Sequence, residues 1–68
     1  MMYTESLRRI REAAELTQKD VARALNVSQF AVSKWERGEG SEPSISRLIQ
    51  LADLYDVSVD VLIGRKQA

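Results

Sequence analysis

The 68-residue sequence contains no cysteine and no histidine. These absences exclude a disulfide framework, a metal cluster built from thiolates or imidazoles, and nucleophilic catalysis by a cysteine–histidine or serine–histidine pair. We therefore expect neither an enzyme nor a bound cofactor. The sequence also has no uninterrupted apolar run long enough for a signal peptide or a membrane-spanning helix. This absence predicts a cytoplasmic protein.

An excess of positive charge is also absent, because ten Lys and Arg residues balance ten Asp and Glu residues. A protein that binds nucleic acid usually has a basic surface. The charge is unevenly distributed: residues 1–38 contain seven basic and five acidic residues, whereas residues 39–68 contain three and five. A neutral chain is expected to bind DNA poorly without sequence specificity, and to depend on a few well-placed contacts or on dimerisation.

The most informative segment is TQKDVARALNVSQFAVSKWERG, residues 17–38. Its pattern predicts two short helices joined by a sharp turn. Thr17, with Asp20 three residues later, is suited to cap the first helix in a capping-box arrangement. Asn26 is expected to end that helix, because asparagine tolerates the left-handed backbone conformation found at helix C-termini. Ser28 is suited to cap the second helix.

The second helix, over residues 29–37, has two different faces. A rotation of about 100° per residue brings Ala31, Val32 and Trp35 together as an apolar face. The opposite face is polar apart from one aromatic ring, and consists of Gln29, Phe30, Ser33, Lys34 and Arg37. A fully buried helix would not have this composition.

These residues resemble the helix-turn-helix of the Cro and phage-repressor family, also called the XRE family. The similarity covers nearly the whole chain, from LRRIREAAELTQ to EPSISRLIQLADLYDVSVDVLIG. It rests on Gln18, on the small residue Ala22, on the run Trp35-Glu36-Arg37-Gly38, and on the apolar residues Val21, Leu25, Val27 and Val32. Three features depart from the family pattern: Asn26 replaces a common glycine, while Phe30 and the acidic loop 39–42 are unusual next to DNA.

The resemblance implies a single all-α domain over residues 1–68, with five short helices of the lambda-repressor-like type and the helix-turn-helix at residues 17–37. It implies sequence-specific binding of double-stranded DNA by a transcriptional regulator, most often a repressor, with the helix from Gln29 in the major groove. In this family, Arg11 of the first helix is expected to pair with Glu36.

Individual DNA contacts follow from the same placement. An amide at the start of a major-groove helix can bind adenine N6 and N7 together, the role expected for Gln29. Lys34 could donate to guanine or to a phosphate, and Ser33 could contact a base or none. Phe30 could contact a thymine methyl, or instead pack over the helix end or in a dimer. The residues expected at the phosphates are Gln18, for which solvent exposure is the alternative, Ser28, Arg37 and Ser41.

The rest of the sequence predicts three further helices. Apolar spacing places the first at about residues 4–14, capped by Thr4 and including Ala14 in its apolar stripe. Ser58 is suited to cap a last short helix that ends at Gly64. Ser44 is suited to cap a fourth helix with Leu54 opposite its stripe, Leu51 at the edge, and a stripe of Ile45, Leu48, Ile49, Ala52 and Tyr55.

The last helix is more apolar than one buried face requires. This surplus predicts a homodimer formed through Leu54, Val59 and Ile63. Two alternatives stay open, and the neutral charge permits the second of them. The domain could be an antitoxin or a module that also binds a protein partner, such as a toxin or an anti-repressor, or it could be an interaction domain that has lost DNA affinity.

Overall fold

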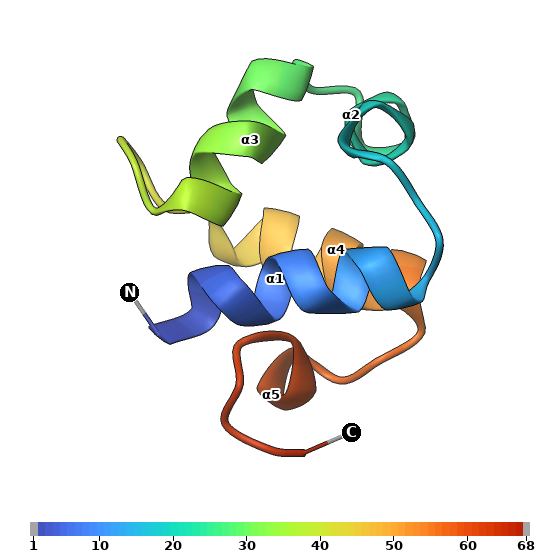
Figure 1. The fold of residues 1–68 in the computed structure, drawn as a ribbon, viewed down its shortest axis with the longest axis vertical. Helices are drawn as coiled ribbons and strands as arrows, with labels where there is room; N and C mark the ends of the chain where they lie inside the picture. Colours follow the sequence, from blue (N-terminus) through green and yellow to red (C-terminus); the bar gives the residue numbers. More distant parts are fainter. Residues whose placement is uncertain (1, 68) are drawn as a thin grey trace.

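All regular secondary structure in the computed structural model, which describes residues 2–67, is α-helical. The helices are α1 (Met2–Ala13), α2 (Gln18–Leu25), α3 (Gln29–Arg37), α4 (Ile45–Tyr55) and α5 (Val59–Leu62). Figure 1 shows α1 crossing in front of α4, with α2 and α3 on one side of this pair and α5 on the other. The predicted all-α fold with five short helices is confirmed.

Each helix contributes a buried apolar side chain to one core. Leu7, Val21, Val32, Leu51 and Leu62 come from α1 to α5 in that order, and each is at most 3% exposed. Burying a side chain of this size contributes about 1.5–3 kcal/mol. The core therefore fixes α2 and α3 on a scaffold made by the other three helices.

The predicted turn between α2 and α3 is confirmed in detail. Thr17 Oγ1 accepts a hydrogen bond from the Asp20 N–H at 3.0 Å, and Asp20 Oδ2 accepts one from the Thr17 N–H at 2.9 Å. Asn26 ends α2 with a left-handed backbone, φ 58° and ψ 46°. Ser28 Oγ accepts from the Ala31 N–H at 3.0 Å and caps α3, which Gly38 ends at φ 71°. Ser44 and Ser58 cap α4 and α5 as expected.

The expected start of α1 is wrong. The helix begins at Met2, so Thr4 lies within its first turn and is not its cap. Tyr3 packs against the core from this turn. At the other end, Ala14 follows the helix and is exposed rather than part of the apolar stripe.

The expected stripe of α4 is also partly wrong. Ile45 and Ile49 are 77% and 48% exposed, while Leu51, which was expected at the edge, is 3% exposed and belongs to the core. Arg47 Nη1 donates to the Leu25 carbonyl at the end of α2, at 3.0 Å. This contact ties α4 to the end of α2, and Leu51 rather than Ile45 or Ile49 faces the core. Leu54 is exposed, as expected.

The two tyrosines should make the fold less stable in alkaline solution. Burial and the hydrogen bond from Tyr3 Oη to Glu42 Oε2, at 2.8 Å, raise the pKa of Tyr3 to about 12. Burial, assisted by the charge of Glu36, raises the pKa of Tyr55 to about 12. Unfolded tyrosines ionise at about pH 10. Between these values the unfolded state binds fewer protons than the folded state, so the free energy of unfolding falls as pH rises.

Denaturant unfolding at a series of alkaline pH values measures this decrease, and tyrosinate absorbance of the folded protein measures the two pKa values. Tyr3→Phe should make the pH dependence shallower, because one of the two shifted groups is removed. Two tyrosines that ionise at about pH 10 in the folded protein would contradict the prediction.

Candidate nucleic-acid interface

Helix α3 is anchored by one face and presents the other to solvent. Val32 is buried, and Trp35 packs against the core as predicted from the apolar face. The opposite face has the predicted polar composition, with Gln29, Phe30 and Arg37 exposed and Ser33 and Lys34 half-buried. In Figure 1, α3 lies on the opposite side of α1 from α5. Its outward side chains offer amide, hydroxyl, ammonium and guanidinium donors to a ligand.

Phe30, Lys34 and Ser41 lie together at this surface. Phe30 is 66% exposed, and the Lys34 Nζ lies 5.1 Å from the centre of its ring, within the range of a cation–π contact. A shallow depression is lined by Phe30, Ala31, Lys34, Trp35 and Ser41. The loop after α3 therefore brings Ser41 next to the outward face of the helix.

The acidic residues of this loop each have a partner. Glu39 Oε1 lies 3.4 Å from Arg37 Nη2, in an ion pair whose side chains are both more than half exposed. Glu42 accepts the hydrogen bond from Tyr3 at the start of α1. Such an exposed pair contributes only about 0–1 kcal/mol, so the Arg37 guanidinium can exchange Glu39 for a phosphate at little cost.

The predicted ion pair between Arg11 and Glu36 is confirmed. Arg11 donates from Nε to Glu36 Oε2 at 2.7 Å and from Nη2 to Glu36 Oε1 at 3.0 Å. Its third donor, Nη1, reaches the Leu16 carbonyl at 2.9 Å. The two side chains are only 11% and 6% exposed. The hydrogen bonds to Glu36 raise the pKa of Arg11, against the opposing effect of burial. This pair joins α1 to the end of α3.

Gln18 is the third member of this network. Its Nε2 donates to Glu36 Oε1 at 3.0 Å, so the side chain is directed along the start of α2 toward the end of α3. Gln18 is half-buried, so it is not the solvent-facing residue of the alternative interpretation. An amide nitrogen carries two hydrogens, so this bond leaves one donor for a ligand. The Ser28 hydroxyl likewise keeps its own hydrogen while its oxygen accepts from Ala31.

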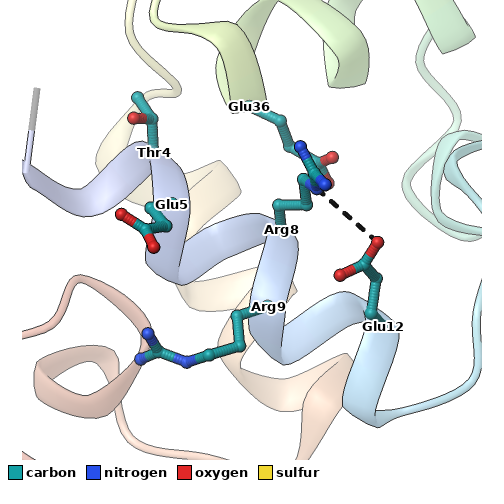
Figure 2. A pocket seen from close by; sticks show the side chains of 6 residues that line it. All are labelled: Thr4, Glu5, Arg8, Arg9, Glu12 and Glu36. Carbon is teal, nitrogen blue, oxygen red and sulfur yellow. Dashed lines mark ion pairs between the residues drawn. The ribbon is translucent and has the colours of Figure 1, made fainter.

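Figure 2 shows a second, polar depression along α1. Arg8 and Glu12 form an exposed ion pair at 3.5 Å, and Arg9 points away from it. The lining is mixed in charge, and consists of Thr4, Glu5, Arg8, Arg9, Glu12 and Glu36. The pair places Arg8 on a solvated helix surface. The depression shows no concentration of positive charge comparable to a phosphate-binding site.

The three residues expected at a dimer interface lie on α4, on α5 and just after α5. Leu54 is 37% exposed, while Val59 and Ile63 are half-buried. Val59 packs against the core, and Ile63 lines an apolar depression with Tyr3, Pro43 and Leu48. Part of the apolar surplus predicted for α5 is therefore used within the chain. The exposed Ile45 and Ile49 on α4 were missed by the sequence prediction.

Neither a membrane-spanning helix nor a metal site is found in the part of the chain that the structure describes. None of the helices within residues 2–67 is long and apolar enough to cross a membrane. The same residues contain no group of three or more carboxylate side chains placed to hold a metal ion. The polar groups of the α3 surface are suited to contacts with a polar ligand surface.

This fold, with its short turn between α2 and α3 and an outward polar face on α3, defines a helix-turn-helix domain. A family model described as helix-turn-helix matches residues 7–62, which is most of the chain. The chain belongs to this family, in its Cro and phage-repressor (XRE) branch. Its members include transcriptional regulators that bind DNA.

Three curated proteins are similar to nearly the whole chain. The uncharacterized HTH-type transcriptional regulator YobD of Bacillus subtilis is 36% identical over 93% of this chain and 55% of its own length. The HTH-type transcriptional activator BcrR of Enterococcus faecalis is 34% identical over 98% of this chain and 32% of its own. The cryptic phage CTXphi transcriptional repressor RstR of Vibrio cholerae is 35% identical over 96% of this chain and 57% of its own length.

A solved structure shows the same fold. The crystal structure of a transcriptional regulator from Listeria innocua superposes with a TM-score of 0.83 at 33% identity, and covers 97% of this chain and 61% of that one. The chain thus spans about half the length of most of these relatives. Their similarity concerns the helix-turn-helix domain.

Proposed function

We propose that the chain binds double-stranded DNA with sequence specificity as a transcriptional regulator, and that it acts as a repressor. The observation that supports this best is the outward face of α3. A short helix whose opposite side is fixed by Val32 and Trp35 presents polar side chains that a globular core does not need. A helix of this size fits the major groove of B-DNA.

Gln29, Phe30, Ser33 and Lys34 are proposed to contact base edges. Gln29 is the first residue of α3 and is exposed, so its amide is free to approach adenine N6 and N7. The exposed Phe30 ring follows it and would contact a thymine methyl. Lys34, one turn later, would donate to guanine O6 or N7.

Gln18, Ser28, Arg37 and Ser41 are proposed to contact phosphates on either side of the groove. Gln18 and Ser28 stand at the starts of α2 and α3, where backbone N–H groups and the helix dipole favour an anion. Arg37 supplies a charge at the end of α3, and Ser41 supplies a hydroxyl from the loop. Contacts of this kind fix the orientation of the helix but do not select a sequence.

A homodimer through Leu54, Val59 and Ile63 is proposed to bind a palindromic operator. A domain with no net charge has little electrostatic affinity, and a second recognition helix about 34 Å away would supply what one helix lacks.

Selection of bound sequences from random duplex DNA, followed by a retardation assay on genomic fragments, tests the proposal. Enrichment of a palindrome would support it, whereas no binding at low salt would reject it. A reporter gene placed behind the selected operator then distinguishes repression from activation, a distinction that matters because both occur among the similar proteins.

Replacing Leu54 with glutamate is expected to keep the protein monomeric and to weaken operator binding by about 100-fold or more, the usual gain from two linked sites. Sedimentation with and without operator DNA measures the oligomeric state. Ala13→Glu adds the same charge at an exposed residue of α1 and is the matched control. Wild-type protein that sediments only as a monomer, both free and on operator DNA, would contradict the dimer.

The exposed apolar residues of α4 favour one second candidate. Ile45 and Ile49, one turn apart on α4, would suit a protein partner such as a toxin or an anti-repressor, and the neutral charge of the domain is compatible with a function that does not involve DNA. A complex with a partner that survives Ile49→Glu unchanged would reject this surface as the binding site.

A further inference from the structure

Gly40 lies against the end of the Lys34 side chain. A Cβ atom at position 40 would stand 2.7 Å from Lys34 Cε and 2.8 Å from Lys34 Nζ, closer than real Cβ atoms approach other heavy atoms. The lysine therefore occupies the space that any other residue at position 40 would fill. Gly40 also has φ +69°, in the left-handed region that favours glycine.

The Lys34 ammonium also lies over the ring of Phe30. The two residues are four positions apart on α3, so their side chains lie on the same face of the helix. The ring centre is 5.1 Å from Nζ, and Ser41 lines the same shallow depression as these two side chains. Two contacts, one with the ring and one with the loop at Gly40, thus restrict the end of a side chain with four rotatable bonds.

We propose that Gly40, together with Phe30, positions Lys34 for reading one base pair of each half-site. The inference rests on the proposed function and identifies residues that would contribute to its sequence specificity. A confined lysine loses less conformational freedom on binding, and it presents its charge at one place along the groove. An unconfined lysine at the same position would reach a phosphate as readily as a base edge. Gly40 itself touches no DNA in this proposal and acts through Lys34.

The test compares Gly40→Asn with Lys34→Ala on two duplexes, the selected operator and the same duplex with one base pair exchanged. That base pair is the one at which Lys34→Ala loses discrimination. Asparagine tolerates positive φ but carries a Cβ, so it displaces Lys34 at a small backbone cost. We expect Gly40→Asn to lower the discrimination at this base pair by about five- to tenfold. Its salt dependence should equal that of wild type, because no charge is lost.

Two further variants separate positioning from a general disturbance of the loop. Gly64→Asn is the matched control, because Gly64 has φ +83° and a Cβ there would meet only Ser6 atoms at 3.7 and 3.8 Å. In the Lys34→Ala background, Gly40→Asn should have no additional effect on discrimination. A further loss in that background, or an equal loss of affinity for all sequences, would overturn the proposal in favour of a disturbed Ser41 contact.

A measurement without DNA keeps the inference separate from the proposed function. Ring-current shifts of the Lys34 side-chain protons in NMR spectra should be present in wild type and absent in Phe30→Leu, and they should shrink in Gly40→Asn. Unchanged shifts in Gly40→Asn would reject the positioning even if the operator is bound. Loss of discrimination by Gln29→Ala but not by Lys34→Ala would reject base reading by Lys34 and leave the proposed function intact.

Discussion

Replacing Arg11 with alanine is expected to lower the free energy of unfolding by about 3–5 kcal/mol. Arg11 places two donors on the Glu36 carboxylate and a third on the Leu16 carbonyl, with almost no exposure to water. Without Arg11, Glu36 keeps only the hydrogen bond from Gln18 and becomes a buried charge without a counter-ion. Removal of one member of a buried pair costs far more than the pair contributes as a whole.

Chemical denaturation of wild type and Arg11→Ala measures this difference. Arg8→Ala is the control, because Arg8 lies on the same helix and pairs with Glu12 at 3.5 Å, with both side chains more than half exposed. Its removal should change stability by less than about 0.5 kcal/mol. The double variant Arg11→Ala with Glu36→Ala should be less unstable than the sum of the single changes, because no charge is left unpaired. Equal unfolding midpoints for wild type and Arg11→Ala would rule out a buried pair.

The same network connects stability with the proposed DNA contacts. Glu36 joins the side chain of Gln18 at the start of α2 to the last turn of α3, and Arg11 ties both to α1. Two residues proposed to contact phosphates lie at helix ends that this network holds together: Gln18 at the start of α2 and Arg37 at the end of α3. A rigid spacing between such contacts fixes the angle at which α3 enters the groove.

Local signals in the sequence were sufficient for the helix-turn-helix itself. Thr17, Asp20, Asn26 and Ser28 act through backbone atoms within four residues, so their roles could be predicted without knowledge of the fold. The pair between Arg11 and Glu36 could not be obtained this way, because 25 residues separate them. Its prediction came from the family resemblance, and the geometry agrees.

Contacts between helices explain what the sequence did not predict. The apolar residues of α4 allow two overlapping stripes, and periodicity could not decide between Ile45 and Leu51 as the inward residue. The packing of α4 against α2 and α5 decides it, and Arg47 adds a hydrogen bond to the carbonyl of Leu25. The sequence also could not predict that Lys34 lies beside Gly40, because this contact depends on the path of the loop after α3.

Replacing Gln29 with alanine is expected to cost about 1–3 kcal/mol of operator binding in each half-site and to relax the preference at one base pair, an adenine. Gln29 is exposed at the first position of α3, so its truncation should leave the fold unchanged. Removal of a base contact and removal of a phosphate contact should affect binding differently, because only the base contact depends on the DNA sequence. Affinity for unrelated DNA should therefore barely change.

Arg37→Ala is the matched comparison at the other end of α3. It should weaken operator and unrelated DNA alike, and should reduce the slope of log K against log salt concentration by about 0.9 in each subunit. Gln18→Ala, which removes an uncharged contact, should lower affinity without changing the slope or the base preference. Repeated selection with each variant measures the base preference, and binding titrations at several salt concentrations measure the affinity and the slope. If Gln29→Ala selects the wild-type operator unchanged, α3 does not enter the groove through its first turn, and the assignment of base contacts along the helix has to be revised.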